Sequence, residues 1–505
     1  MKYHLLTGAT GLLGYYLLHD AARVGVPLAV VVRPTRMASA RQRIEDLLAR
    51  WERTINVTLP RPVVLEGDLT KPLLGFDEET VDWVGEHCEA LIHNAASLTF
   101  QAESPEGEPY RSNVTGTANV LGLCRRAGIR RFHHVSTAYV CGLREGTILE
   151  SELDVGQTLG NDYEKSKVQS EKMVAEADFL DSVTVMRPGI IIGDSRTGYT
   201  STFHGFFVPL KVGHGLISSV ASGSGMDVAT LISLFDLDGQ ERKNFVPVDW
   251  VSAVMMQVIA NSDLHGRTYH LTPENRTPLS EMAEVMAEVI VASPPAKTMG
   301  NVSIDLYHNT LVEQLQVYQA YWRDDPVFDL TNTHQAAANL PCPTVDRAML
   351  RRMCQYAIQA NFGWPVEPSS IPEFDVHAAL SEACPSSVGR QADELLGLQV
   401  NGPGGGQWSL EVCDGHVVGH QRGLSDRCKA TAYLNCHTYR AIRDGRLSAA
   451  DALRQGVLLI ETSGGNWEDR WVDALQTLVG KKANGVVQSV GQDDLVSSPS
   501  GRVGT

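Results

Sequence analysis

The first 270 residues alternate short apolar runs with longer amphipathic segments. Six of the apolar runs are predicted to be buried strands: Tyr3–Thr7, Leu28–Val32, Val63–Glu66, Ala90–His93, Arg131–Ser136 and Val183–Arg187. Segments with helical apolar spacing lie between several of them: Gly11–Val24, Arg41–Arg53 and Val114–Ala127. Strands and helices in this order predict an α/β fold with a doubly wound parallel sheet, which binds ligands at the carboxyl ends of its strands.

The rest of the chain is predicted to be a helical extension followed by a smaller domain. Residues 271–375 are mainly helical in pattern and are interpreted as an extension on the substrate side of the sheet. Residues 376–406 are predicted to be a linker because they end in a run rich in glycine and proline. Residues 407–482 are predicted to form a small α+β domain, and residues 483–505 a disordered tail without a core pattern.

Two features indicate the strands of the small domain. Gln407–Val412 and Gly415–His420 alternate like the arms of a hairpin, and Asp414-Gly415 between them is a favoured turn pair. Ala430–Asn435 is predicted to be a further strand. Helices are expected near Thr438–Arg443 and Ala449–Gln455.

Charge, hydropathy and cysteine usage exclude several classes of protein. The formal net charge of −16 argues against a protein that grips nucleic acid phosphates or a membrane surface. No apolar run reaches the roughly 18 residues of a transmembrane helix. The nine cysteines form no C-x-x-C pair and are interpreted as scattered reduced thiols, not as a disulfide frame or a metal site. This pattern favours a cytoplasmic protein.

A glycine motif directly follows the first predicted strand. Thr7 to Gly14 read T-G-A-T-G-L-L-G, so that the glycines are spaced G-x-x-G-x-x-G. Gly8 permits a tight turn, Gly11 lets the backbone approach a pyrophosphate, and Gly14 lets the helix pack against the sheet. Together with Thr10, Leu12 and Leu13, these glycines are the predicted phosphate loop of a Rossmann-type dinucleotide site. The alternative is a glycine-rich packing turn.

Arginines after the second strand indicate the type of dinucleotide. An NAD site usually carries an acidic residue at this place, but the sequence has Arg33, with Arg36 nearby. Guanidinium groups suit the 2′-phosphate of NADPH, and the alternative is a solvated loop arginine. After the third strand, Asp68 could accept a hydrogen bond from the adenine amino group, beside Leu69. An aspartate that serves only the turn is the alternative.

Tyr163 and Lys167 form a Y-x-x-x-K motif, which on a helix places both side chains on one face. A lysine there can lower the pKa of the tyrosine, which can then donate a proton near neutral pH. Ser136 and Thr137 end the fifth predicted strand and could place a hydroxyl beside the tyrosine. A bare Y-x-x-x-K match is usually an exposed helix pair, so this interpretation depends on the surrounding motifs.

In its first 290 residues the chain resembles the extended short-chain dehydrogenase/reductase family. The resemblance is carried by T-G-x-x-G-x-x-G and by Gly67-Asp68-Leu69, His93-Asn94-Ala95-Ala96, Asn113-Val114-x-Gly116-Thr117, Ser136-Thr137, Tyr163-x-x-x-Lys167, Arg187-Pro188-Gly189 and Phe245–Asp249. It implies a reductase domain over residues 1–270 with a catalytic set of Thr137, Tyr163 and Lys167. It also implies that Asn113 supports a proton relay or the catalytic helix. Asn94, Ala95, Ala96, Pro188, Gly189 and Ile190 are implied to line the cofactor.

Within that family, two segments resemble the fatty acyl reductases and the thioester reductase domains. These are Ser136–Val140 and Arg187–Gly198. The resemblance implies that NADPH reduces an acyl thioester, on coenzyme A or an acyl carrier protein, to an aldehyde. A second reduction would give an alcohol, and the sequence does not decide between the two products. The substrate is expected to be a long-chain acyl thioester or another lipid carbonyl.

The small C-terminal domain resembles the sterol-carrier-protein fold. The resemblance rests on Trp408–Gly415, Ala430–Leu434, residues 441–447 and Gly456–Ile460. It implies a lipid ligand, which a tethered carrier would hold at high effective concentration near the reductase. The alternative is a structural or dimerisation domain.

Two other functions remain open for the whole chain. The first is a hydroxysteroid or sugar-nucleotide dehydrogenase or epimerase of the same fold, which would favour NAD and is disfavoured by Arg33. The second is a lipid-binding or transfer protein with a redox-sensing scaffold. The set of Thr137, Tyr163 and Lys167 argues against this second function.

Overall fold

The computed structural model describes residues 2–36, 38–219, 239–293, 321, 323–363, 374–384, 394–402, 404–462 and 469–478. The chain divides into two compact units. The first unit comprises Met1–Trp51 and Pro62–Ser369, and the second comprises Glu52–Arg61 and Ser370–Thr505. The predicted tail, residues 483–505, lies outside the described residues, as does much of the predicted extension between 294 and 320.

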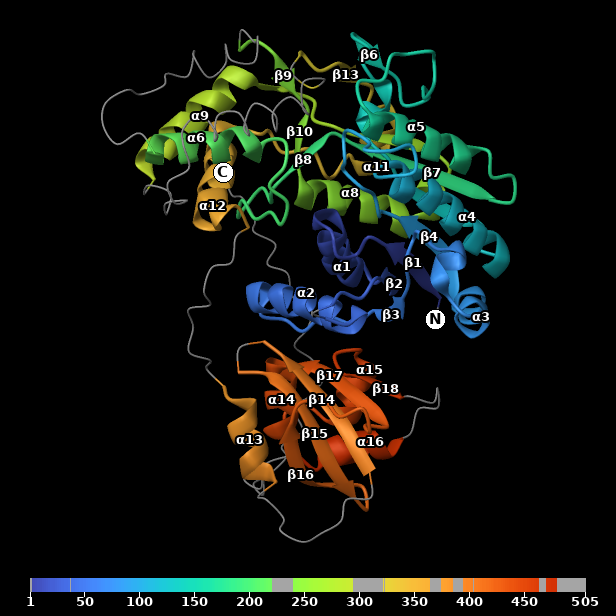
Figure 1. The fold of residues 1–505 in the computed structure, drawn as a ribbon, viewed down its shortest axis with the longest axis vertical. Coiled ribbons are helices and arrows are strands. Elements are labelled where there is room, and N and C mark those ends of the chain that lie inside the picture. Colours follow the sequence, from blue (N-terminus) through green and yellow to red (C-terminus); the bar gives the residue numbers. More distant parts are fainter. Residues whose placement is uncertain are drawn as a thin grey trace, which may run out of the picture. The chain divides into compact units, whose positions relative to one another are not determined.

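A seven-stranded parallel sheet forms the centre of the first unit (Figure 1). Its spatial order is β11-β7-β5-β4-β1-β2-β3. The strands are β1 (Tyr3–Thr7), β2 (Leu28–Val32), β3 (Val63–Glu66), β4 (Cys88–His93), β5 (Arg131–Val135), β7 (Ser182–Pro188) and β11 (Thr268–Leu271). The predicted α/β class with a doubly wound sheet is confirmed. The seventh strand, β11, was not among the six predicted strands, and it is only four residues long.

Helices lie on both faces of this sheet (Figure 1). They are α1 (Leu12–Val24), α2 (Ala40–Ile55), α3 (Glu78–His87), α4 (Gly116–Ala127), α5 (Asp162–Ala175) and α8 (Val248–Ala260). Leu5, Leu91 and Phe132 pack on one face against side chains of α3 and α4. Every residue of β2 is buried, which is why the strands have continuous apolar runs and lack the alternation of half-exposed strands.

The direction in which successive strands are added to the sheet reverses between β1 and β4. Strands β2 and β3 extend from one side of β1, and β4, β5, β7 and β11 extend from the other. The ends of neighbouring strands are in register, with Thr7 opposite His93 and His93 opposite His134. Loops that follow β1, β4, β5 and β7 therefore meet at one edge. In open α/β sheets this place, outside the carboxyl ends at the change of direction, is where ligands bind.

A second layer of short elements surrounds the carboxyl edge. It comprises β6 (Thr147–Ile148), β8 (Ile190–Ile192), β9 (Arg242–Lys243), β10 (Phe245–Pro247), β12 (Thr277–Pro278), β13 (Val327–Phe328), α6 (Phe207–Ser219), α9 (Leu279–Ala292), α11 (Thr331–Ala337) and α12 (Arg347–Gln359). Side chains of α6, α9 and α12 share a core with Ile192 and Phe245. The described part of residues 271–375 contains α9, α11 and α12 together with the short strands β12 and β13.

The second unit contains a five-stranded sheet in the order β16-β15-β14-β17-β18. Its elements are α13 (Val376–Ala383), β14 (Glu394–Asn401), β15 (Gly406–Cys413), β16 (His416–Arg422), β17 (Ala430–Asn435), α14 (Cys436–Arg443), α15 (Ala449–Arg454), β18 (Leu459–Thr462) and α16 (Asp469–Gln476). Strands β14 and β17 are parallel, and the other neighbours are antiparallel. Trp408 and Trp471 are buried in a core to which strands and helices both contribute.

One predicted boundary differs from the structure. The stretch 376–406 was expected to be a linker, but it contains α13 and the central strand β14. Its glycine-rich end connects β14 to β15, which pair as antiparallel neighbours. The glycines that suggested a linker therefore mark a turn inside the second unit. The predicted hairpin turn at Asp414-Gly415 is present, with positive φ angles of 50° and 75° that such a turn requires.

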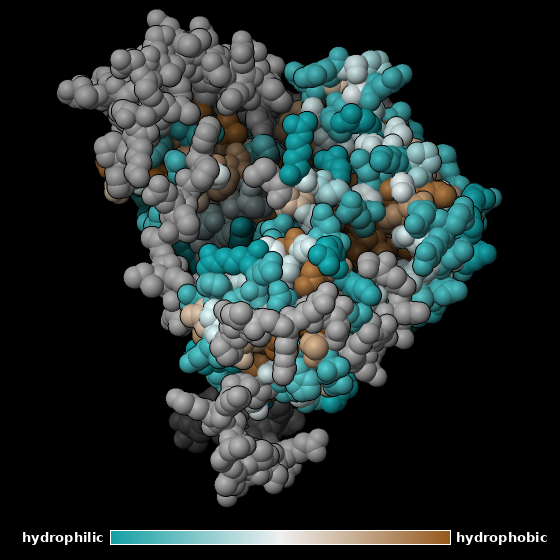
Figure 2. Space-filling view, turned by 60° about the horizontal axis from the view of Figure 1, so that its bottom comes forward, coloured by the Kyte–Doolittle hydropathy of each residue, from teal (hydrophilic) through white to brown (hydrophobic). Residues whose placement is uncertain are grey.

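The described surface gives no sign of a membrane span. Hydrophilic side chains cover most of the described surface seen in Figure 2. No helix among the described residues is both long and apolar enough to cross a bilayer. All nine cysteines are free thiols.

Candidate active site

The glycine loop packs against the end of β4 without room for side chains. Gly8 has a φ of 74°, and a Cβ there would lie 2.6 Å from the Ala95 nitrogen. A Cβ at Gly14 would lie 2.0 Å from the Gly8 oxygen, because the first turn of α1 packs directly on the loop. Both positions therefore require glycine for the fold itself.

Gly11 is different from the other two glycines. A Cβ at Gly11 would meet one described atom within 4 Å, the Gly8 oxygen at 3.6 Å, which is an ordinary contact. Gly11 is exposed and precedes the first residues of α1, Leu12 and Leu13, whose side chains are buried. The protein itself does not need a glycine there, so the missing side chain suits a phosphate at the helix N-terminus.

Three arginines follow β2, the strand that pairs with β1. Arg33 and Arg36 follow β2 and are exposed. Arg43 from α2 donates to the Thr10 hydroxyl at 3.1 Å and to the Arg33 carbonyl oxygen. No ion pair among the described residues engages any of the three. Arg43 was missed from the sequence, since only its place on the helix after β2 could have indicated it.

Asp68 and Leu69 lie in the turn after β3. The Asp68 carboxylate accepts hydrogen bonds from the backbone N–H and the hydroxyl of Thr70, at 3.0 and 2.9 Å. Partial burial opposes ionisation, but these bonds and the charge of Arg33 lower the pKa of Asp68. The Leu69 carbonyl accepts from Asn119 at 2.8 Å. The carboxylate is therefore engaged by its own turn, as the alternative interpretation expected, and stays charged beside Arg33.

The residues after β4 support the glycine loop from the other side. The Asn94 side chain donates to the Gly8 carbonyl oxygen at 3.1 Å, and the Ala95 N–H donates to the Thr7 hydroxyl at 3.2 Å. Ala96 is exposed. The loops after β1 and β4 are thus hydrogen-bonded to each other at the carboxyl edge.

Thr137, Tyr163 and Lys167 come together at the same edge. Thr137 begins the short helix η3 (Ala138–Cys141) after β5, and its hydroxyl accepts from the Tyr139 N–H at 3.3 Å. The Thr137 hydroxyl also hydrogen-bonds Tyr163, which lies in the first turn of α5. Lys167 is buried one turn later and donates to the Val135 carbonyl oxygen at 2.8 Å. Ser136 is also buried, but its hydroxyl has no hydrogen-bond partner among the described residues.

Burial shifts both titrating groups of this set. It raises the pKa of Tyr163 to about 12, although the hydrogen bond from Thr137 acts in the opposite direction. It lowers the pKa of Lys167 to about 8, against the attraction of Glu171. The sequence suggested that Lys167 lowers the pKa of Tyr163, but in the structure Thr137 is the group that does so. At neutral pH the tyrosine keeps its proton and can donate it.

Asn113 links the loop after β4 to the catalytic helix. It lies in η2 (Arg111–Thr115) and is 2% exposed. Its side chain accepts from the Ser97 N–H at 2.7 Å and donates to the Ser97 carbonyl oxygen at 3.0 Å and the Ser166 hydroxyl at 2.9 Å. Of its two expected roles, these contacts favour support of the helix that carries Tyr163.

Pro188, Gly189 and Ile190 form the junction between β7 and β8. The Ile190 N–H donates to the Asn244 carbonyl oxygen at 2.9 Å, and a Cβ at Gly189 would lie 2.5 Å from that oxygen. The junction therefore holds β10, which pairs with β8, against the carboxyl edge.

Aromatic side chains that the sequence did not single out surround Tyr163. The Phe100 ring centroid lies 5.7 Å from that of Tyr163 and 5.4 Å from that of Tyr321. Tyr321 also lies 5.1 Å from Tyr139, whose hydroxyl donates to Asp325 at 2.6 Å. Tyr321 and Asp325 come from the extension, more than 150 residues after Tyr163. No local pattern could have placed them here.

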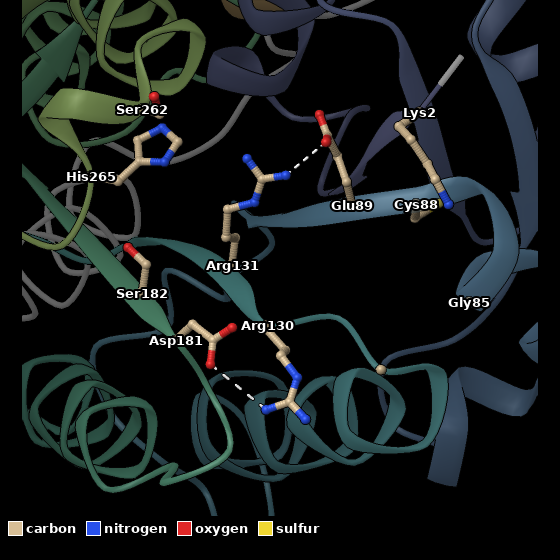
Figure 3. Close-up of a pocket in the computed structure, with 11 residues that line it drawn as sticks. Lys2, Gly85, Cys88, Glu89, Arg130, Arg131, Asp181, Ser182, Ser262 and His265 are labelled. Carbon is tan, nitrogen blue, oxygen red and sulfur yellow. Dashed lines mark hydrogen bonds and ion pairs between the residues drawn. The ribbon is translucent and has the colours of Figure 1, made fainter.

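A cavity of about 520 Å³ lies at the opposite, amino edge of the sheet (Figure 3). Its two arginines are paired, Arg131 with Glu89 at 2.6 Å and Arg130 with Asp181 at 3.7 Å. The length of the strands separates this cavity from Thr137 and Tyr163. The carboxyl edge, and not this cavity, therefore holds the candidate active site.

A family comparison agrees with this fold. Residues 6–255 match the NAD-binding family described as Male sterility protein. The matched part contains the glycine loop, the three arginines and the set of Thr137, Tyr163 and Lys167. The structural fit of the glycine loop and the family match together indicate a nicotinamide dinucleotide site.

Curated proteins and solved structures give similar results. "Aldehyde reductase lnaA" of Aspergillus flavus is 26% identical over 404 residues, which are 72% of this chain and 37% of that protein. "Nonribosomal peptide synthetase asaC" of Aspergillus flavus is 26% identical over 369 residues, 66% of this chain and 34% of that protein. The chain thus spans about a third of these relatives.

Among solved structures, the terminal R domain from the myxalamid PKS-NRPS biosynthetic pathway is 27% identical to this chain. The match has a TM-score of 0.57 and covers 72% of this chain and 92% of that domain. This chain is therefore similar to that R domain over most of the domain's length.

Replacing Gly11 and Gly14 by alanine should separate binding from folding. Gly11→Ala is expected to leave the thermal unfolding midpoint within about 2 °C, since the new methyl group meets no close protein atom. It should weaken binding of a nicotinamide dinucleotide at least tenfold, measured by titration of intrinsic fluorescence. Gly14→Ala should instead lower the midpoint, because its methyl group has no space. Undiminished binding by Gly11→Ala would contradict the assignment of the phosphate loop.

Proposed function

Since residues 6–255 match the Male sterility protein family, we propose that this chain is an NADPH-dependent reductase that converts an acyl thioester to an aldehyde. The observation that carries the proposal is the convergence of Thr137, Tyr163 and Lys167 at the carboxyl edge, beside the glycine loop. The likeness to reductase domains of peptide and polyketide assembly lines supports a thioester substrate. One relative bears the name aldehyde reductase, which supports a site that can also reduce an aldehyde, the step that would follow the first reduction.

The chain's own residues account for the proton side of this reaction. The bound dinucleotide supplies the hydride that reduces the thioester carbonyl carbon. The hydroxyls of Thr137 and Tyr163 donate hydrogen bonds to the carbonyl oxygen as negative charge develops on it. Tyr163 then gives its proton to that oxygen, and Lys167 stabilises the phenolate left behind. The resulting hemithioacetal breaks its carbon–sulfur bond to release the aldehyde and a thiol.

The arginines beside the glycine loop support NADPH over NADH. Arg33 and Arg36 present exposed guanidinium groups after β2, where the ribose of a dinucleotide lies in this type of fold. Arg43 anchors Thr10 and the Arg33 backbone, and so fixes the position of the loop. A 2′-phosphate is the ligand group that two or three guanidinium groups would bind at this place.

The apolar surroundings of Tyr163 support a lipid or other apolar acyl group. Phe100, Tyr139 and Tyr321 would line the acyl part of the substrate. Coenzyme A or an acyl carrier protein would hold the thioester. We also propose that the second unit is a sterol-carrier-like lipid-binding domain, supported by its mixed five-stranded sheet and the helices that share its core. Nine free thiols support a cytoplasmic location.

Replacement of Tyr163 by phenylalanine tests the proposed function. Tyr163→Phe should lower kcat by roughly 10²–10⁴-fold while the affinity for NADPH stays within twofold, because only the proton donor is lost. The assay follows NADPH oxidation with long-chain acyl-coenzyme A, a carrier-bound acyl thioester, a sterol and a nucleotide sugar. Tyr269→Phe is the matched control, since that tyrosine donates to Leu264 away from the site. Turnover of the sterol or nucleotide sugar but of no thioester would overturn the proposal.

Lys167 should set the alkaline limit of the reaction. Its pKa is lowered to about 8 by burial, so that the ammonium group is lost as the pH rises through about 8. We expect kcat/KM for NADPH to fall above that pH in the wild type, since this ratio reports the free enzyme. Lys167→Arg, whose charge persists throughout, should show a lower but flat profile between pH 7 and 10. If kcat/KM of Lys167→Arg falls at the same alkaline pH as in the wild type, another group causes the fall.

Arg33 should discriminate between the two cofactors. Arg33→Ala is expected to raise KM for NADPH about tenfold, the equivalent of one lost charged hydrogen bond, and to leave KM for NADH unchanged. Arg125→Ala serves as the control, because Arg125 is an exposed arginine that pairs with Asp178 elsewhere in this unit. Equal effects on both cofactors would show that Arg33 does not contact the 2′-phosphate.

A further inference from the structure

His93, the last residue of β4, makes two buried hydrogen bonds to threonines of different elements. Its Nδ1 lies 2.9 Å from the hydroxyl of Thr7 at the end of β1, and its Nε2 lies 3.0 Å from the hydroxyl of Thr117 on α4. Each of the three side chains is at most 2% exposed. His93 therefore bridges the strand that carries the glycine loop and the helix that follows Asn113.

The hydrogen bonds that Thr7 and Thr117 make to other residues determine which atom donates in each of the two bonds to His93. The Thr117 hydroxyl donates its one hydrogen to the Asn113 carbonyl oxygen at 2.6 Å, because a carbonyl can only accept. Its oxygen must then accept from His93, so the proton of the imidazole lies on Nε2. Nδ1 is left to accept from Thr7, whose oxygen in turn accepts from the Ala95 N–H at 3.2 Å.

The hydrogen bonds continue from Asn113 to the catalytic helix α5. Asn113 donates to the Ser166 hydroxyl at 2.9 Å, and Ser166 donates to the Tyr163 carbonyl oxygen at 2.7 Å. Ser166 is fully buried. Two directed sets of hydrogen bonds, joined through the backbone and the side chain of Asn113, therefore run from the residues that support Gly8 to the first turn of α5.

His93 stays neutral, as this arrangement requires. Burial lowers the pKa of its imidazole to about 3, and the charge of Lys167 adds to the effect. A protonated ring would place a hydrogen on Nδ1, which could no longer accept from Thr7. Protonation of His93 therefore does not break the bridge at neutral pH.

The adjacent histidines do not make such a bridge. His133 and His134 on β5 are as buried as His93, but neither nitrogen of either ring has a hydrogen-bond partner among the described residues. Burial of an imidazole in this sheet thus does not by itself produce a polar network. The two bonds of His93 are a specific property of its position.

We propose that His93, as its Nε2-protonated neutral tautomer, is the positioning residue that couples the glycine loop to the helix carrying Tyr163 and Lys167. This inference rests on the proposed function, because it assumes that a cofactor at the glycine loop and the proton donor Tyr163 must be held in register. Loss of the bridge would leave the hydroxyls of Thr7 and Thr117 buried with one partner fewer. Ala95, which packs against Gly8, and Asn113 would then both be held less firmly in place.

The tautomer can be tested without any substrate. Nitrogen-15 NMR of the full-length protein with labelled histidine should show one imidazole as the Nε2–H tautomer, unchanged from pH 5 to 8, that disappears in His93→Gln. A signal for His93 that titrates in this range, or one that reports Nδ1–H, would overturn the proposal. This result is independent of whether the protein reduces thioesters.

The coupling can be tested with matched variants. His93→Phe should weaken NADPH binding and lower kcat, each about tenfold, the equivalent of one buried hydrogen bond. His133→Phe replaces an equally buried imidazole that has no hydrogen bond among the described residues, and should leave both values within twofold. If the two variants behave alike, His93 contributes only packing and the proposal fails.

The two ends of the bridge should separate in the kinetics. Thr7→Val should mainly raise the Kd of NADPH, and Thr117→Val should mainly lower kcat, measured with whichever carbonyl substrate the wild type turns over. Thr7→Ser and Thr117→Ser, which keep the hydroxyl, should restore wild-type values. In the double valine variant, the loss in kcat/Kd should be smaller than the product of the two single losses. The reason is that either change frees the His93 ring and so also weakens its bond to the other threonine. Strictly multiplicative losses would show two independent sites and would overturn the coupling.

Discussion

The close packing of the glycine loop on the end of β4 is the constraint on which the rest of the site depends. The absent Cβ of Gly8 would lie 2.6 Å from the Ala95 nitrogen, and that of Gly14 2.0 Å from the Gly8 oxygen. These contacts bring the strand ends at the change of chain direction close together. They leave an exposed backbone at Gly11, where the helix N-terminus faces outward, and so combine a structural requirement with a binding surface.

Burial has opposite consequences for the two titrating groups at this edge. It raises the pKa of Tyr163 to about 12 and lowers that of Lys167 to about 8, because both groups lose hydration of their charged forms. The first effect keeps a proton on the group proposed to donate it. The second brings the pKa of the lysine closer to neutral pH, but its ammonium group is still mostly charged at pH 7 and can stabilise a phenolate. A polar network of His93, Asn113 and Ser166 holds these groups in place without adding charge.

Local patterns predicted the first unit well, because its strands are buried on both faces and its glycines act within a few residues. The six predicted strands are all present, and Thr137 and Tyr163 meet as their motifs indicated. Features made by distant segments could not be predicted. Tyr321 and Asp325 reach the site from the extension, and Arg43 reaches back from α2 to Thr10. The glycine-rich run near residue 402 suggested a linker, since a turn within a sheet and a flexible connection have the same composition.

The central claim is that the protein reduces a thioester at the carboxyl edge of its sheet. The stoichiometry of a single turnover tests this claim most directly. Enzyme in excess over an acyl-coenzyme A would be mixed with NADPH, and the NADPH consumed, the free thiol released and the carbonyl product would be quantified together. The account predicts that one thiol and one aldehyde appear for the first NADPH oxidised, and that any further NADPH oxidised converts aldehyde to alcohol without more thiol. Oxidation of NADPH without release of thiol would contradict the account and would indicate a ketone or another carbonyl as the substrate.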